Sequence, residues 1–160
     1  MLAVKLICVG KMRERFYIDA FEEYSKRLRA YCKLELTELA EQRLSDSPSA
    51  REIENALSRE AAEIIKNIPP DAYTVAMCVE GRMLKSEGVA ELIAAREGSG
   101  KPRLCLIIGG SFGLDESVKA RADMRLSMSA MTFPHHLARV MLAEQLYRGF
   151  KINEGSKYHK

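Results

Sequence analysis

Short apolar runs alternate along the chain with segments in which apolar residues recur at helical spacing. Runs that indicate strands cover 2–9, 73–79 and 104–108, and the last of these is apolar at every position. Uninterrupted apolar runs are typical of parallel strands that are buried on both faces. Alternating polarity at 34–39 indicates a half-exposed edge strand, and another short strand is expected near 125–128.

Between these strands, apolar residues recur every three or four positions, as they do in amphipathic helices. The first helix is expected to present an apolar face of Phe16, Ala20, Phe21, Tyr24 and Leu28. A second helix is expected to begin after Ser49, because Glu52 lies three residues later in a capping-box spacing, and to end before Pro69. Further helices are expected from Ser86, from 115 to about 122 and from 134 to about 152.

This order of elements predicts the fold class. Strands that alternate with helices in a chain of 160 residues indicate a single α/β domain over 1–160, an open parallel sheet with helices on both faces. Ligands of such sheets bind in the crevice at the carboxyl ends of the strands. The turns after residues 79, 108 and 128 are therefore expected to border one site.

Composition narrows the class of protein further. No apolar run approaches the roughly 20 residues that span a bilayer, and the first residues lack the pattern of a signal peptide, so we expect a cytoplasmic protein without a membrane segment. The four cysteines are widely spaced, three of them in apolar runs, which is typical of free core thiols. The three histidines have no thiol or carboxylate at ligand spacing, so no metal site is expected.

The net charge of +3 is concentrated at one end of the chain. Residues 148–160 contain four cations against one anion, while the remaining 21 basic and 21 acidic residues cancel. Cations gathered in one segment are suited to contact phosphates, but a solvated terminal tail would have the same composition. Charge alone leaves these two interpretations open.

Two loops carry the candidate chemistry. Gly109 and Gly110 follow the buried strand at 104–108, and the absence of two Cβ atoms lets a nucleotide-like ligand approach the backbone. A tight turn with no ligand would also use glycine here. The spacing of Gly109, Gly110 and Gly113 differs from the G-x-G-x-x-G of dinucleotide enzymes and comes late in the chain, which disfavours a nucleotide-dependent oxidoreductase.

The second loop, 127–134, combines hydroxyl side chains with apolar ones. Its serines and Thr132 offer hydrogen bonds, Met131 and Phe133 offer apolar walls, and Pro134 suits the first turn of the next helix. A plain connection between a strand and a helix remains the alternative for this segment.

The last helix has two apolar faces. Leu142, Leu146 and Phe150 lie on one of them, and Leu137, Val140 and Met141 lie roughly opposite. The second face predicts a homodimer in which this helix meets its copy, unless the helix is buried entirely within one domain. Glu144 and Arg148, four residues apart, suit a simple helix-stabilising ion pair.

The order of these motifs resembles a known family. Ile-Gly-Gly-Ser-x-Gly at 108–113, Leu-Ser-Met-Ser-Ala-Met-Thr-Phe-Pro-His at 126–135, Arg-Val at 139–140, Glu-Gln-Leu-Tyr-Arg at 144–148 and a terminal Tyr-His-Lys at 158–160 are similar to the ribosomal RNA large subunit methyltransferase H family, RlmH. RlmH belongs to the SPOUT, or trefoil-knotted, class. The resemblance covers the whole chain, including Val9-Gly10-Lys11, and is most specific in the C-terminal third.

The resemblance implies a homodimer with a C-terminal trefoil knot and S-adenosyl-L-methionine as cofactor. The implied reaction is N3-methylation of a pseudouridine in 23S ribosomal RNA within the assembled 70S ribosome, with neither DNA nor membrane as partner. The implied donor pocket consists of Met77, Gly110, Ser129, Ala130, Met131, Thr132, Phe133 and Pro134.

Methyl transfer requires the accepting nitrogen to be held in line and its proton to be removed. Candidates for this proton handling or for orienting the base are His135, Glu144, Arg148, Tyr158 and His159, and the residues alone do not assign the base. A different interpretation is a ribosome- or RNA-binding module that kept the fold without catalysis. Such a binder would have no need of the paired loops at 109–110 and 129–134.

Overall fold

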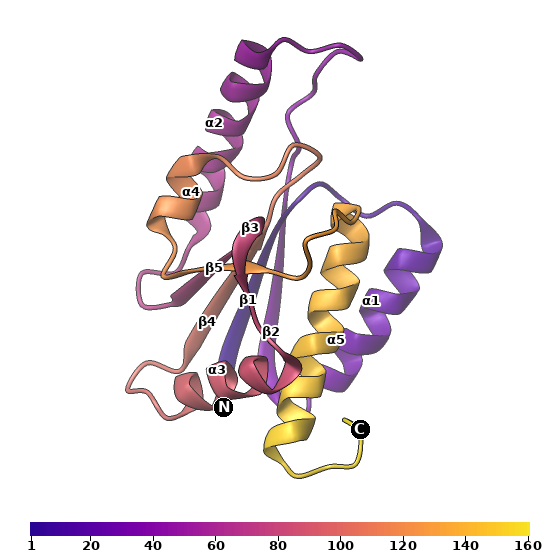
Figure 1. The fold of residues 1–160 in the computed structure, drawn as a ribbon, viewed down its shortest axis with the longest axis vertical. Helices are drawn as coiled ribbons and strands as arrows, with labels where there is room; N and C mark the ends of the chain where they lie inside the picture. The colour runs from indigo at the N-terminus through magenta and orange to yellow at the C-terminus, as the bar shows by residue number, and fades with distance from the viewer.

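The computed structural model describes residues 1–160 and shows five strands alternating with five helices (Figure 1). In chain order the elements are β1 (Leu2–Val9), α1 (Arg15–Leu28), β2 (Cys32–Leu39), α2 (Ala50–Asn67), β3 (Tyr73–Met83), α3 (Ser86–Glu97), β4 (Arg103–Ile108), α4 (Glu116–Arg121), β5 (Met124–Ser127) and α5 (His135–Asn153).

All neighbouring strands are parallel, in the order β2-β1-β4-β3-β5. The predicted α/β sheet is thus confirmed, as are the central position of β4, buried from Leu104 to Ile108, and the edge position of β2. In Figure 1, β1, β2 and β4 run upward, and β4 ends at the loop that leads to α4. Both chain termini lie near the lower end of the molecule, and the start of α2 lies at its upper end.

Helices cover both faces of the sheet, and each face has its own core. Alternate residues of β1 point to opposite faces: Leu6 joins a core with α1, α3 and α5, while Ile7 joins one with α2 and α4. In Figure 1, α1 and α5 lie side by side, and α2 and α4 lie together on the other side of the sheet. Because β1 and β4 are covered on both faces, their apolar runs are uninterrupted.

Local capping fixes where two of the helices begin. The Ser49 hydroxyl accepts from the Glu52 amide at 3.1 Å and the Glu52 carboxylate accepts from the Ser49 amide at 3.2 Å, so the predicted capping box is confirmed. Asp115 caps α4 through a simple N-cap hydrogen bond, its carboxylate accepting from the Ser117 amide at 3.0 Å. The proline that was expected in the first turn of α5, Pro134, instead occupies its N-cap position.

Two expectations of the sequence were wrong in detail. Phe16 is 65% exposed and its ring lies 4.4 Å from that of Tyr17, because the buried face of α1 is made by Phe21 and Leu28 further along the helix. Strand β3 continues past the expected turn at Gly81 to Met83.

The continuation of β3 depends on close backbone packing. A Cβ atom at Gly81 would lie 2.8 Å from the backbone nitrogen of Leu126 in β5, which is tighter than any side chain tolerates. The register with β5 shifts between Met77 and Arg82, so a bulge separates two stretches of pairing. A glycine that looked like a turn signal therefore marks a bulge that brings β3 against β5.

The four cysteines are free, as expected. Cys8 and Cys105 are buried in their apolar strands and Cys32 is buried as well, whereas Cys78, in the apolar run of β3, is only partly buried. No helix of the chain is both long and apolar enough to span a membrane.

Candidate functional site

A cavity of about 800 Å³ lies at the carboxyl ends of β3, β4 and β5. Its walls come from the ends of β3 and β5, from the loop at 108–114 and from the loop at 127–135. The segments around residues 79, 108 and 128 therefore border one cavity, as predicted, although residue 79 lies within β3 and not before a turn. A cavity of this size suits a cofactor or another small-molecule ligand.

The loop after β4 requires its glycines. A Cβ atom at Gly109 would overlap the carbonyl group of Gly113, so the chain doubles back on itself only without a side chain there. The Gly113 amide donates to the Gly110 carbonyl at 3.1 Å, and Gly113 has a φ of +81°. These contacts fix a tight loop whose backbone forms one wall of the cavity.

The loop after β5 is shaped by its own hydroxyl groups. The Ser127 hydroxyl donates to the Ser129 carbonyl at 2.9 Å, and the Ser129 hydroxyl accepts from the Met131 amide at 3.0 Å. Helix α5 starts directly after this loop and has neither a capping side chain nor an acidic residue in its first turn. The positive end of the helix dipole thus lies beside the cavity with no acidic residue in its own first turn.

Most residues of the predicted donor pocket line this cavity. Those that do are Met77, Gly110, Ser129, Met131, Thr132, Phe133 and Pro134, and the catalytic candidate His135 joins them. Ala130 is the exception, because it is exposed and does not line the cavity.

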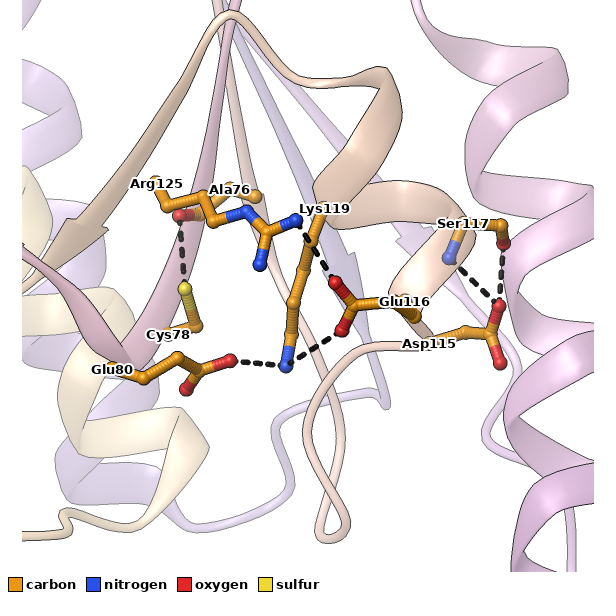
Figure 2. Close-up of polar contacts among 8 residues, drawn as sticks. All are labelled: Ala76, Cys78, Glu80, Asp115, Glu116, Ser117, Lys119 and Arg125. Carbon is orange, nitrogen blue, oxygen red and sulfur yellow. Dashed lines mark hydrogen bonds and ion pairs between the residues drawn. The ribbon is translucent and has the colours of Figure 1, made fainter.

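An ion-pair network borders the cavity beside β3. Figure 2 shows the Lys119 ammonium between the carboxylates of Glu80 and Glu116, with Arg125 on the other oxygen of Glu116 at 2.9 Å. Lys119 lines the cavity and its pairing with Glu80 lowers the pKa of that carboxyl. Sequence reasoning missed this network, because its members lie on three elements and no motif links them.

His135 has a polar atom with no intramolecular partner. Its Nε2 atom is buried without a hydrogen bond. Burial lowers the pKa of His135, and the neighbouring His136 lowers it further. The neutral ring is therefore favoured at physiological pH, and a neutral imidazole has one nitrogen free to accept a proton. Of the five predicted catalytic candidates, His135 alone lines this cavity.

A thiol also lines the cavity. The Cys78 sulfur lies 3.8 Å from the Ala76 carbonyl oxygen (Figure 2), and burial raises the pKa of the thiol. The protonated thiol is a poor nucleophile, so the cavity does not offer an activated cysteine.

Arg139 connects the first turns of α5 to the ends of β1 and β2 through hydrogen bonds. Only 1% of the residue is exposed, and its Nη1 atom donates to a Glu38 carboxylate oxygen at 2.6 Å. Its Nη2 atom donates to the Gly10 carbonyl at 2.8 Å. Helix α5 is thus anchored where β1 and β2 end, which supports the wall that His135 contributes to the cavity.

The other four catalytic candidates form a separate cluster along α5. The Arg148 guanidinium binds the Glu144 carboxylate through two nitrogens at 2.6 and 2.9 Å, and the Tyr158 hydroxyl reaches the same carboxylate oxygen at 3.2 Å. Arg148 also lies 3.3 Å from His159 Nδ1, while His159 Nε2 contacts Glu87 of α3 at 3.0 Å. The C-terminal segment is therefore folded back onto α5 and the start of α3. We call Glu144, Arg148, Tyr158 and His159 the tail cluster.

Two members of the tail cluster hold their protons firmly in this arrangement. The hydrogen bond to Glu144 raises the pKa of Arg148, and burial, with the Glu144 charge, raises the pKa of Tyr158. Neither group accepts a proton at neutral pH in this state. The predicted ion pair of Glu144 with Arg148 is confirmed, and it is one part of a larger network.

A second cavity of about 510 Å³ connects the two regions. It shares Met77, Leu126, Ser127 and Met128 with the first cavity and extends along α5 to Val140, Met141 and Glu144. Val140 and Met141 belong to the second apolar face of α5 that the sequence predicted, and both are only half-buried. This face is therefore not buried entirely within one chain.

Comparison with known proteins gives the family context of this geometry. The sequence profile of a family described as "Predicted SPOUT methyltransferase" matches residues 2–159. A "Ribosomal RNA large subunit methyltransferase H" from Clostridium beijerinckii is 45% identical over 157 residues, which is 98% of this chain and 99% of the relative. Proteins of the same name from Clostridium novyi and Streptococcus pyogenes are 43% identical over 98% and 99% of this chain, and over 99% and 100% of their own lengths.

Solved structures of lower identity share the fold. A probable methylase family protein from Haemophilus influenzae is 16% identical with a TM-score of 0.58, over all of this chain and 72% of that one. A tRNA (m1G37) methyltransferase from Aquifex aeolicus is also 16% identical, with a TM-score of 0.56 over 91% of this chain and 69% of its own. Identity at this level supports the architecture alone.

Proposed function

The chain belongs to the SPOUT methyltransferase family, and on that premise we propose that it transfers a methyl group from S-adenosyl-L-methionine to N3 of a pseudouridine in 23S ribosomal RNA. The observation that carries the proposal is the single cavity formed by the loops at 108–114 and 127–135. The curated relatives, of nearly identical length, are named for the large subunit ribosomal RNA.

The residues of the cavity fit such a donor. The backbone of the tight loop at Gly109 and Gly110 forms one wall, and Met77, Met131 and Phe133 offer apolar surface for an adenine ring. Serine and threonine hydroxyls and the uncapped start of α5 offer hydrogen bonds to the polar groups. We propose as donor-binding residues Met77, Gly110, Ser129, Ala130, Met131, Thr132, Phe133 and Pro134, Ala130 as part of the loop backbone.

When bound, the sulfonium group of the donor supplies an electrophilic methyl, so no metal is needed for activation. The chain has to hold the accepting nitrogen in line with that methyl, keep water out and handle one proton. The loop at 127–135 and the wall of β3 enclose the space in which these tasks meet.

The proton-handling residue belongs to one of two groups. His135 lies at the donor cavity with its neutral ring favoured, which suits a proton acceptor. The tail cluster contains Glu144, Arg148, Tyr158 and His159, and we propose that Arg148 and the tail orient the RNA base. In its own chain the tail lies away from the loop at 108–114 (Figure 1), so we propose that it serves the cavity of the partner subunit.

The proposal includes a homodimer built on the second apolar face of α5. Leu137, Val140 and Met141 are half-buried, and an isologous contact would cover them together with the second cavity. The C-terminal trefoil knot that the family resemblance implies stays a prediction.

We further propose that the substrate is the assembled 70S ribosome in the cytoplasm. Two of the four cations that gave the tail its charge surplus are paired within the chain, Arg148 with Glu144 and Lys151 with Glu154. Because residues 1–147 carry no net charge and part of the tail charge is paired, we expect the protein to bind free RNA weakly. Recognition would then depend on the shape of the ribosome.

The test is mass spectrometry of 23S ribosomal RNA from cells with and without the gene for this protein. We expect one N3-methylated pseudouridine that disappears with the gene and returns when the purified protein and donor are added to 70S ribosomes. An RNA-binding module without catalysis would bind ribosomes and leave the mass of every nucleotide unchanged. That outcome would reject the proposed activity.

A further inference from the structure

Glu41 contacts the glycine loop beside the cavity from a distant part of the chain. It lies in the segment between β2 and α2, and its Oε1 atom accepts from the Ser111 amide at 2.7 Å across 70 residues of sequence. Ser111 is part of the loop that forms one wall of the cavity. An amide bound to a charged carboxylate makes a stronger hydrogen bond than one bound to a neutral carbonyl.

The glycine loop is shaped to receive this carboxylate. A Cβ atom at Gly110 would lie 2.5 Å from Glu41 Oε1 and 2.9 Å from its carboxyl carbon. Glycine at this position therefore permits the close contact with Glu41 behind the wall of the cavity. The carboxylate fits the space that a side chain at Gly110 would fill.

The second carboxylate oxygen lies near Gly10 and the first residues of α5. A Cβ atom at Gly10 would lie 3.5 Å from Glu41 Oε2, 3.3 Å from His135 Nε2 and 3.5 Å from His136 Nε2. The carboxylate is thus close to the start of α5 as well as to the glycine loop. It lies between the two loops that the proposed donor has to contact.

The backbone beside Glu41 is held in place. The Gln42 amide donates to Glu60 Oε2 at 2.8 Å, and Glu60, on α2, is only 7% exposed. Glu41 is therefore presented by a fixed segment, so that its hydrogen bond to the loop costs less side-chain and backbone ordering.

We propose that Glu41 is a positioning residue of the donor cavity, which holds the Ser111 amide and thereby keeps the glycine loop at 109–113 in its donor-binding shape. The inference rests on the proposed function, since the donor is taken to be S-adenosyl-L-methionine. Glu41 itself does not line the cavity, so its effect on the donor passes through the loop.

The test compares Glu41→Ala and Glu41→Gln with the intact protein, with Glu35→Gln as the matched control. Glu35 lies on the neighbouring strand β2 and pairs with Lys5, so the control removes a carboxylate without touching the loop. We expect Glu41→Ala to raise the Kd and KM for S-adenosyl-L-methionine about tenfold while kcat at saturating donor changes less than about twofold. Glu41→Gln keeps an acceptor oxygen and should stay within about threefold of the intact protein.

Hydrogen exchange of the Ser111 amide gives a second readout that needs no donor. The inference predicts faster exchange in Glu41→Ala than in the intact protein, with protection largely restored in Glu41→Gln, a conservative variant expected to fold. Equal donor affinity in Glu41→Ala, or a glutamine variant no better than alanine, would overturn the inference. If the intact protein fails to bind the donor, the proposed function fails, and Ser111 exchange still tests the contact of Glu41.

Discussion

The two groups of residues that the sequence singled out behave differently in the folded chain. Around the donor cavity, hydrogen bonds fix the loops and leave open space, with the His135 Nε2 atom unpartnered. The members of the tail cluster instead bind one another or Glu87. The groups that would act on a substrate are therefore occupied by contacts within the chain. The two groups lie at different places along α5, which is the element common to both.

The cavity is thus preorganised for a ligand, whereas the polar groups of the tail cluster are bound to groups of their own chain. Backbone and hydroxyl contacts shape the donor cavity in a single chain, so donor binding should need no partner and no movement of the tail. The tail cluster has to break its internal hydrogen bonds before it can contact RNA. The free energy of each broken bond offsets part of the free energy gained from the new contact. We therefore expect changes at one region to leave the other nearly intact.

The change with the most severe expected result is Gly109→Ala. Its methyl group would overlap the Gly113 carbonyl, so the loop after β4 has to move and the donor cavity loses a wall. We predict a loss of donor binding of more than about a hundredfold and no detectable methyl transfer, measured by calorimetry and by tritiated methyl incorporation.

Gly100→Ala is the matched control for that change. No atom lies within 4 Å of a Cβ atom built at Gly100, so the methyl group enters open space. Donor binding should be unchanged in this variant. A Gly109→Ala protein that binds the donor normally would show that the glycine loop is not part of the site.

Deletion of Tyr158, His159 and Lys160 should impair methyl transfer without impairing donor binding. The deletion removes the hydrogen bonds of Tyr158 to Glu144 and of His159 to Glu87 but no residue of the cavity. We predict an unchanged Kd for S-adenosyl-L-methionine and a fall in methyl transfer to ribosomes of roughly a hundredfold, the size expected for a lost proton-handling or orienting group. Unchanged transfer would remove the tail from the mechanism.

Mixing the two inactive proteins tests whether the tail acts in the cavity of its own chain or in that of the partner. A heterodimer of one Gly109→Ala chain and one tail-deleted chain has one sound donor cavity and one sound tail on different chains. Recovery of methyl transfer after mixing is expected if the tail serves the partner's cavity. If the tail served its own chain, no complete site would form and transfer would stay absent.

Sequence reasoning located the two loops that line the cavity because their determinants are local in the chain. Gly109 and Gly110 directly follow a buried strand, and Ser129 to Pro134 directly precede a helix, so each loop could be located before the fold was known. Parallel strands then bring both loops to one edge of the sheet.

Contacts between distant segments were out of reach of the same reasoning. The contacts of Glu41 with Ser111 and of Arg139 with Glu38 can be predicted only when the order of the strands in the sheet is known. No spacing in the sequence indicates them. The tail charges were interpreted only in part, because the sequence predicted the pair of Arg148 with Glu144 but not the pair of Lys151 with Glu154.

The mildest expected effect concerns the pH dependence of stability. The pKa of His135 in the folded protein is lowered, so below the ordinary histidine value of about 6.5 the unfolded chain binds more protons than the folded one. Stability should therefore rise with pH through this window and fall as the pH drops from 7 to 5.

His135→Gln removes that contribution. We predict that the melting temperature of this variant falls less between pH 7 and pH 5 than that of the intact protein, as measured by circular dichroism. Parallel curves for the two proteins would mean that His135 titrates alike in the folded and unfolded chains.

The most direct measurement is calorimetric titration of S-adenosyl-L-methionine into the intact protein and into the protein without Tyr158, His159 and Lys160. A donor cavity complete in itself predicts saturable binding with the same Kd for both proteins. The absence of binding to the folded intact protein, or its loss on deletion of the tail, would contradict a donor site built by the loops at 108–114 and 127–135.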